Sequence, residues 1–174
     1  MMTLLLLFLT ALPSTQLPGT DGKTHALATE ASAHAWTVVL FFSRECPVQR
    51  AHDARLLALA HDFAGRVSFI AVDAQAGATL EASKRDVEAR GYPFPLVVDP
   101  DGTWADALEV RFSTTLVVLD GKGRVRYRGG LDEQRVKLSG DFTPLARNAL
   151  ERLLAGEEPE RIETKALGCV LRRR

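Results

Sequence analysis

Apolar residues in the chain fall into short unbroken runs, separated by stretches in which they recur every three or four positions. Residues 36–42 and 67–72 are apolar runs rich in β-branched and aromatic side chains, which is typical of strands buried on both faces of a sheet. Between these runs, apolar residues from Val48 to Phe63 have helical spacing, and Pro47 suits the first turn of that helix. The strand, helix and strand therefore predict a parallel β-α-β crossover.

The second half of the chain predicts further strands and helices around the same sheet. A helix is expected over residues 79–91, where a threonine precedes the helical pattern and a glycine ends it. A short strand is expected over 95–99. Residues 115–119 and 124–128 flank a glycine-containing turn, which predicts an antiparallel hairpin, and a last helix is expected over 143–156. The predicted fold class is α/β, with a mixed central sheet flanked by helices.

Composition places these elements in one globular domain. The chain has 174 residues, of which 46% are hydrophobic and 25% are charged, which is enough apolar mass for a packed core. We expect the domain to span residues 16–156, with an apolar segment before it at 1–15 and an irregular tail after it at 157–174. The 22 basic and 22 acidic residues give a formal net charge of +0, so we expect no nucleic-acid partner.

The apolar run from Thr3 to Leu12 has the length of the hydrophobic part of a secretory signal peptide. It is too short to cross a bilayer, which needs about 20 apolar residues, so we expect no stable membrane span. The run predicts a signal peptide and a periplasmic or secreted protein. Because no basic residue precedes the run and no clear cleavage site follows it, the alternative is an apolar N-terminal segment of a cytoplasmic protein.

Cys46 is one of only two cysteines and lies between the first buried strand and the predicted helix. In an open α/β sheet, catalytic groups gather where the carboxyl end of a strand turns into a helix. The N–H groups of a first helical turn favour negative charge, so Cys46 is expected to have a lowered pKa and to act as a redox-active nucleophile. The alternative is an inert buried thiol that packs as a small hydrophobic residue.

Cys169, the second cysteine, lies in the predicted tail. It could return to the strand–helix junction as a resolving cysteine, form a structural disulfide in an oxidising compartment, or be an unpaired thiol on a loose tail. Two cysteines cannot supply a four-ligand zinc site, and His52 and His61 are too far apart on their helix for a metal pair. We therefore expect no metal ion and no other cofactor.

The order of the segments VVLFFS, Cys46-Pro47, VSFIAVDA, PFPLVVDPDG and LVVLDGKGRVRYRGGLD resembles the redoxin group of thioredoxin-like proteins. That group includes the alkyl hydroperoxide reductase and thiol-specific antioxidant type. The segment from Thr164 to Cys169 is similar to the Thr-x-x-x-Gly-Cys ending of single-domain redoxins that have a Cys-Pro-x-x centre. The resemblance extends from about Leu17 to Cys169, and it implies a thioredoxin-like fold with antioxidant or other thiol-dependent redox chemistry.

The chain departs from thioredoxins and peroxiredoxins at several positions of this pattern. Gln49 replaces the second cysteine of C-x-x-C, Leu40 replaces the buried aspartate, and Thr114 aligns with the cis-proline that faces the cysteine in this superfamily. Ser43 supplies the hydroxyl that peroxiredoxins carry three residues before their peroxidatic cysteine, but the arginine expected near Thr114 is absent. Arg44 and Arg111 are the candidates to replace its charge.

These observations favour a thiol–disulfide oxidoreductase in which Cys46 is the nucleophile and Cys169 or an external thiol resolves the intermediate. Ser43, Pro47, Gln49 and Thr114 are expected to line the site. The partners would be thiols or disulfides of proteins or small molecules. Because several motif residues are lost together, the first alternative is a non-catalytic binding module on a thioredoxin-like scaffold. A thiol peroxidase is the second alternative.

Overall fold

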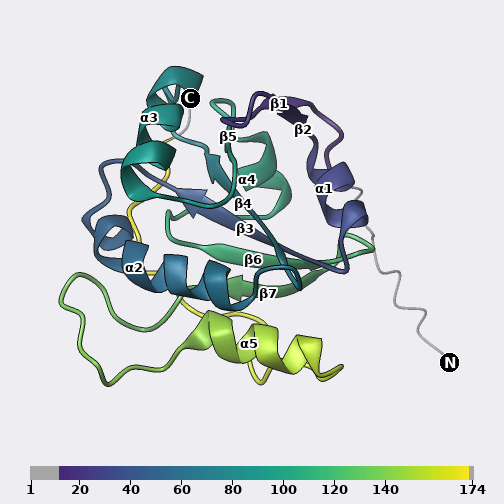
Figure 1. Ribbon diagram of the computed structural model, residues 1–174, viewed down its shortest axis with the longest axis vertical. Coiled ribbons are helices and arrows are strands. Elements are labelled where there is room, and N and C mark those ends of the chain that lie inside the picture. The colour runs from purple at the N-terminus through teal and green to yellow at the C-terminus, as the bar shows by residue number, and fades with distance from the viewer. Residues whose placement is uncertain (1–11, 173–174) are drawn as a thin grey trace, which may run out of the picture.

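The computed structural model describes residues 12–172 and shows a mixed five-stranded sheet with helices on both faces (Figure 1). The strand order in this sheet is β5-β4-β3-β6-β7, and β1 and β2 form a separate two-stranded ribbon. The strands are β1 (Leu17–Pro18), β2 (Thr24–His25), β3 (Trp36–Phe42), β4 (Ser68–Asp73), β5 (Leu96–Val98), β6 (Leu116–Asp120) and β7 (Val125–Gly129). The helices are α1 (Leu27–Ala33), α2 (Pro47–Asp62), α3 (Leu80–Arg90), α4 (Thr103–Ala107) and α5 (Leu145–Leu154).

The directions of the strands place two carboxyl ends side by side. Strands β3, β4 and β5 are parallel, whereas β6 and β7 are antiparallel to their neighbours. Phe42, the last residue of β3, is in register with Asp73, the last residue of β4. The chain therefore leaves both strands at the same end of the sheet, and α2 begins at this carboxyl end. This end is where the fold brings segments together that are far apart in sequence.

Side chains of the central strand alternate between two apolar layers, as a strand buried on both faces requires. Val38, Leu40 and Phe42 pack on one face against α2 and α5, and Val39 and Phe41 pack on the other. The first layer also holds Leu56, Leu59 and Phe63 of α2 and Ala146, Ala149, Leu150 and Leu153 of α5. The second layer holds Leu27 and Ala31 of α1 and Trp104 and Ala105 of α4. In Figure 1, α2 and α5 lie below the sheet, and α3 lies at the β5 edge.

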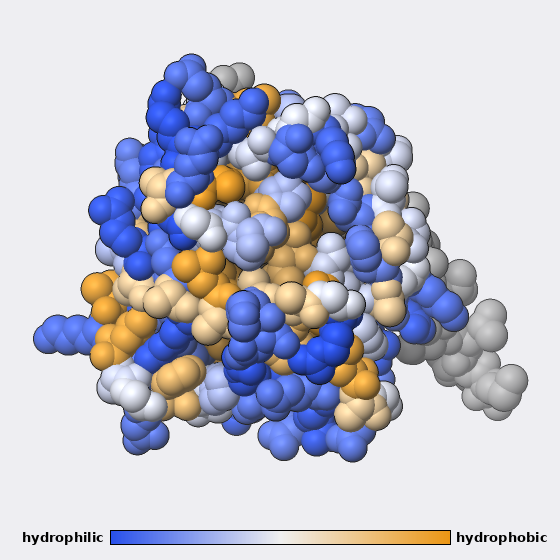
Figure 2. All heavy atoms as spheres, in the orientation of Figure 1, coloured by the Kyte–Doolittle hydropathy of each residue, from blue (hydrophilic) through white to orange (hydrophobic). Residues whose placement is uncertain are grey.

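The surface reflects this layering. Figure 2 shows polar atoms, in blue, around the rim of the face that is turned to the viewer, and apolar atoms, in orange, toward its centre. Within residues 12–172, no helix is both long enough and apolar enough to cross a membrane.

The structure confirms the predicted fold class and most of the predicted elements. Thr79 caps α3 by accepting a hydrogen bond from the Ala82 N–H, and Gly91 ends the helix in the left-handed conformation. The short helix α1, Leu27–Ala33, was not predicted. Of the predicted signal segment at 1–15, residues 1–11 lie outside the described part of the chain.

The predicted tail crosses the sheet edge as an extended segment, without a helix or strand of its own between residues 157 and 172. It is fixed to the domain by two isolated bridges, between Arg128 and Glu163 and between Phe112 and Val170. The Tyr127 hydroxyl lies 2.7 Å from Thr164 Oγ1 and also donates to the Gly130 carbonyl at 2.6 Å. In Figure 1 the yellow tail passes the start of α2 and ends beside α3.

Candidate active site

Cys46 lies at the start of α2, at the carboxyl edge of the sheet. It is the residue before the first helical turn, has extended backbone angles (φ −73°, ψ 116°), and is followed by Pro47. Its own N–H donates to the Ser43 carbonyl at 3.3 Å, and its carbonyl accepts from the Arg50 N–H at 3.1 Å. The loop and the first helical turn thus fix the Cys46 backbone, and the thiol faces N–H groups that the helix leaves unpaired.

The tail brings Cys169 to the same place. The Cys169 N–H donates to Ser113 Oγ at 3.0 Å, and the Cys169 carbonyl accepts from the Ser113 N–H at 2.8 Å. Gly168 permits this approach, because a Cβ at that position would lie 1.9 Å from the Ser113 carbonyl oxygen. Both cysteines are free thiols, and they line one cavity closely enough for the Cys169 thiol to affect the pKa of Cys46. Two cysteines that are far apart in sequence therefore meet at the start of α2.

Hydrogen bonds make the two thiols unequal in acidity. Burial raises the pKa of the Cys46 thiol, whose residue is only 1% exposed, but hydrogen bonds to the sulfur outweigh this effect. They come from the Cys169 thiol, the Ser113 hydroxyl and the backbone N–H groups of Gln49 and Cys169, and they leave the pKa of Cys46 below its ordinary value. Burial, together with the hydrogen bond to Cys46 and its charge, raises the pKa of Cys169 to about 11.

A cavity of about 470 Å³ opens onto both sulfurs. It is lined by Ser43, Arg44, Glu45, Cys46, Asp73, Gln75, Ala76, Gly77, Ala78, Cys169, Val170 and Arg172. Gln75 joins its two sides, because its side-chain amide donates to Ser43 Oγ at 3.1 Å and accepts from the Arg172 N–H at 2.9 Å. Within residues 12–172, no group of three histidine, cysteine or acidic side chains is placed to hold a metal ion.

The structure distributes the predicted site residues unevenly. Ser43 lines the cavity with the two cysteines, and Thr114 lies beside Gly168 with a positive φ of 59°. The side chain of Gln49 instead donates to the Tyr92 hydroxyl at 3.0 Å, and only its backbone N–H faces Cys46. Pro47 acts through the helix start and does not line this cavity. The site thus combines the predicted Ser43, Cys46 and Cys169 with residues that were not predicted.

Among the described residues, the two candidate arginines, Arg44 and Arg111, make no contact that directs either side chain toward the Cys46 sulfur. Arg44 lines the cavity, but its Nε donates to Asp86 at 2.7 Å. Arg111 lies in a separate groove along the tail. The lowered pKa of Cys46 therefore comes from neutral hydrogen-bonding groups and not from an arginine.

Sequence reasoning missed three residues of the site: Asp73, Gln75 and Ser113. Asp73 is 3% exposed and ends a buried parallel strand, a position whose side chain points to the functional edge of such a sheet. Asp73 could therefore have been predicted as a site residue from its place at the end of this strand. Ser113 and Gln75 carry no local signal, because each acts through a partner in the tail more than fifty residues away.

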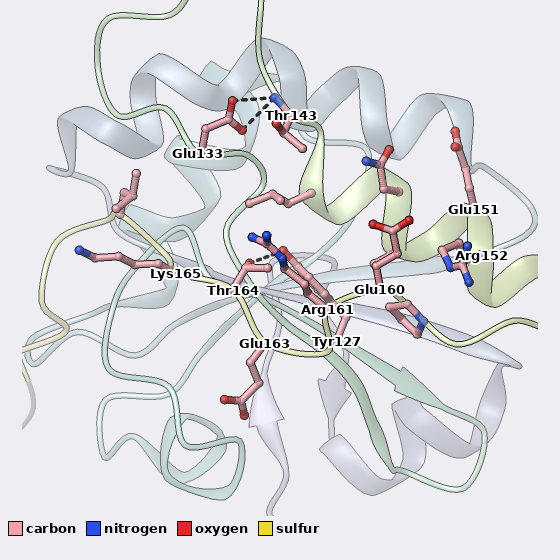
Figure 3. Close-up of a pocket in the computed structure, with 15 residues that line it drawn as sticks. Tyr127, Glu133, Thr143, Glu151, Arg152, Glu160, Arg161, Glu163, Thr164 and Lys165 are labelled. Atoms are coloured by element: carbon pink, nitrogen blue, oxygen red, sulfur yellow. Dashed lines mark hydrogen bonds between the residues drawn. The ribbon is translucent and has the colours of Figure 1, made fainter.

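A larger cavity, of about 850 Å³, lies between α5, β7 and the tail and contains neither cysteine. Figure 3 shows that its polar groups are partly satisfied from within, since the Glu133 carboxylate accepts the Thr143 N–H and the Tyr127 hydroxyl meets Thr164. Of these two cavities, only the smaller one is lined by the two cysteines.

A sequence profile of the AhpC/TSA family matches residues 9–128. The chain belongs to the AhpC/TSA family. No curated protein matches it significantly in sequence. AhpC/TSA membership confirms the redoxin resemblance, and the matched residues include Cys46, whereas Cys169 lies after them.

Solved structures agree with the fold. An uncharacterized conserved protein from Geobacillus kaustophilus is 28% identical, with a TM-score of 0.81 over 93% of this chain and 90% of that chain. A hypothetical protein from Sinorhizobium meliloti is 24% identical, with a TM-score of 0.82 over 94% of each chain. The Xanthomonas campestris bacterioferritin comigratory protein, whose alkyl peroxide reduction activity has been studied, is 18% identical, with a TM-score of 0.61 over 84% of this chain and 93% of that chain.

The acidity of Cys46 is predicted to depend on donors from the tail. Cys169→Ser keeps a hydroxyl donor near the Cys46 sulfur, whereas Cys169→Ala removes it, and each variant leaves Cys46 as the single thiol. Rates of alkylation against pH should give a lower midpoint for Cys169→Ser than for Cys169→Ala. Equal midpoints at the value of an ordinary thiol would show that the tail does not stabilise the Cys46 thiolate.

Gly168→Ala should displace the tail, because the new Cβ would overlap the Ser113 carbonyl. We expect a loss of about 1–3 kcal/mol in stability, the usual cost of overpacking, and faster alkylation of Cys169. Gly140→Ala is the matched control, since no atom lies within 4 Å of its Cβ position. Chemical denaturation and thiol labelling compare the two variants, and the same labelling rate in both would contradict this role for Gly168.

Asp73 should make stability depend on pH. Burial raises its pKa from 3.8 to about 6, so ionising the carboxyl destabilises the folded state as pH rises through that range. Asp73→Asn is expected to raise the free energy of unfolding at pH 8 by up to about 3 kcal/mol and to change it little below about pH 4. Urea unfolding at both values tests this, with the exposed Asp141→Asn as control. A loss of stability at pH 8 would contradict the assignment.

Proposed function

We propose that this AhpC/TSA protein is a thiol oxidoreductase in which Cys46 is the nucleophile and Cys169 is the resolving cysteine. The observation that carries the proposal is the placement of the two interacting thiols on one cavity at the start of α2. An acidic thiol beside a less acidic one is the arrangement that a dithiol–disulfide couple needs, because the first attacks and the second completes the disulfide. The substrates we propose are thiols or disulfides of proteins or small molecules.

With a disulfide substrate, the Cys46 thiolate attacks one sulfur and releases the other as a thiolate. This step forms a mixed disulfide between Cys46 and the substrate. Cys169 then loses its proton and attacks the Cys46 sulfur, which releases the second substrate thiolate. The substrate disulfide is reduced by two electrons, and the Cys46–Cys169 pair is oxidised by two electrons. The contact between the two thiols supports this second step.

Two observations support a thiol peroxidase as the second candidate. Cys46 is 1% exposed beneath the tail, and the cavity that reaches it suits a small oxidant better than a protein disulfide. The Xanthomonas campestris relative in fold is associated with alkyl peroxide reduction. In this reaction the Cys46 thiolate attacks the peroxide oxygen, giving a sulfenic acid and an alcohol, and Cys169 then forms the disulfide with loss of water.

A non-catalytic binding module is less consistent with the site. Such a module needs no acidic thiol, and burying an ionisable group costs free energy unless partners stabilise its charge. Here the neighbouring groups of Cys169, Ser113 and Gln49 lower the pKa of Cys46. For location, the expectation of a periplasmic or secreted protein rests on the apolar run from Thr3 to Leu12, with a cytoplasmic protein as the alternative.

The proposal predicts that a stoichiometric oxidant converts the reduced protein into an intramolecular Cys46–Cys169 disulfide. Cys46→Ser should lose oxidant consumption entirely. Cys169→Ser should still react once, and then accumulate a mixed disulfide with a disulfide oxidant or a sulfenic acid with a hydroperoxide. Intact mass under non-reducing conditions distinguishes these products.

Comparing rates with a hydroperoxide and with a small disulfide on the same protein decides between the two candidate reactions. If neither oxidant produces the intramolecular disulfide in the wild-type protein, the proposed function is wrong. A reaction that survives in Cys46→Ser would assign the nucleophile elsewhere.

A further inference from the structure

The unequal thiols determine which sulfur a reductant must attack in the oxidised protein. In thiol–disulfide exchange, the thiol with the lower pKa leaves faster. Cys46 has the lowered pKa and is almost fully buried, whereas Cys169 is partly exposed. Reduction of a Cys46–Cys169 disulfide therefore begins with attack on the Cys169 sulfur, with Cys46 as the leaving thiolate. The reductant must approach the tail.

A groove of about 430 Å³ lies along the tail at this point and includes Gly168, the residue before Cys169. Its wall is strongly basic, with Arg111, Arg128, Arg135 and Lys165 among the lining residues. The volume falls in the range of sites for small molecules and is too small to hold a folded domain. In Figure 3 the Lys165 side chain extends away from α5.

The acidic residues of the groove are already paired. Glu109 and Glu163 are the two acidic residues that line the groove, and Arg128 forms an ion pair with each of them. Arg111, Arg135 and Lys165 are exposed and form no salt bridge with a carboxylate within residues 12–172, although the charge of Arg111 also acts on Glu109. The charge of Arg135 acts on the Cys169 thiol itself and offsets a small part of the rise in its pKa. The groove thus has an excess of positive charge beside Cys169, in a chain whose formal net charge is +0.

We propose that this groove binds a low-molecular-weight thiol that carries carboxylates, and that this anionic thiol is the reductant of the Cys46–Cys169 disulfide. The inference rests on the proposed function and adds the class of its second substrate. Arg111, Arg135 and Lys165 would bind the carboxylates and raise the local concentration of the thiolate, which is itself an anion. A neutral or cationic thiol gains nothing from these side chains.

The chemistry balances with two molecules of the thiol. The first thiolate attacks the Cys169 sulfur and forms a mixed disulfide, and the Cys46 thiolate leaves. A second thiolate attacks the sulfur of the bound thiol, which yields a free disulfide, and the Cys169 sulfur leaves and takes up a proton. The protein disulfide gains two electrons, and the two thiols lose two.

The test uses the isolated oxidised protein, with its disulfide verified by mass, and measures reduction by mercaptosuccinate, mercaptoacetate, 2-mercaptoethanol and cysteamine. Each rate is divided by the rate of the same thiol with a neutral reference disulfide, which corrects for intrinsic nucleophilicity. We expect the corrected rate to fall from the dianion to the cation, and this order to weaken as salt shortens the screening length from about 30 Å at 0.01 M to about 3 Å at 1 M.

Arg135→Gln and Lys165→Gln should each lower the ratio of the mercaptosuccinate to the 2-mercaptoethanol rate by about two- to fivefold, the size of one surface charge interaction. Using the ratio cancels any change in the reactivity of Cys169. Lys122→Gln, an exposed lysine in the turn between β6 and β7, removes the same charge elsewhere and should leave the ratio unchanged.

The outcomes separate the two proposals. If the disulfide forms but the corrected rates do not depend on thiol charge, the anionic reductant is wrong and the proposed function stands. The same conclusion follows if Lys122→Gln lowers the ratio as much as Arg135→Gln does. Fast reduction by a dithiol protein alone, with no small thiol effective, would also overturn the inference. If no disulfide forms, both proposals fail.

Discussion

The contact between the Cys46 and Cys169 thiols is the interaction on which the rest of the site depends. An anionic sulfur that is 1% exposed is costly unless hydrogen-bond donors replace the water it has lost. The Cys169 thiol and the Ser113 hydroxyl make the two largest contributions that lower the pKa of Cys46, and the Ser113 hydroxyl also accepts the Cys169 N–H. The acidity of Cys46 is therefore a joint property of the helix start and the tail, and the strand–helix junction alone supplies only part of it.

Backbone geometry and one buried side chain hold the tail in place. Leu171 is 5% exposed and belongs to the apolar layer on the α1 and α4 side of the sheet, so it anchors the end of the segment that carries Cys169. Thr114 has a φ of 59°, which is unfavourable for a β-branched residue by about 1–3 kcal/mol. Its N–H donates to the Phe41 carbonyl at 2.7 Å, and Gly168 packs against its side chain. Strain at Thr114 is thus retained where the tail meets the sheet.

The fold could be predicted from the sequence to the extent that its signals are local. The apolar runs of β3 and β4, the capped helix α3 and the hairpin of β6 and β7 each have periodicity or turn chemistry that identifies them. Helix α1 is seven residues long and has no side-chain cap, so it lacks both signals. Cys46 could be singled out from its place after a strand. Ser113 and Gln75 could not, because their functions arise from hydrogen bonds to a tail that is distant in sequence.

The difference in pKa between the two sulfurs also determines which sulfur each substrate of the proposed cycle attacks or is attacked by. The lowered pKa of Cys46 makes it both the better nucleophile toward an oxidant and the better leaving group during reduction. These two roles place the oxidant and the reductant on different sulfurs of the same pair. Both cysteines line the cavity with Asp73 and Ser43, whereas the groove with Arg135 and Lys165 follows the tail next to Cys169. A resolving cysteine on the tail, in place of one within the helix, therefore lies beside a basic groove that can select the reductant by charge.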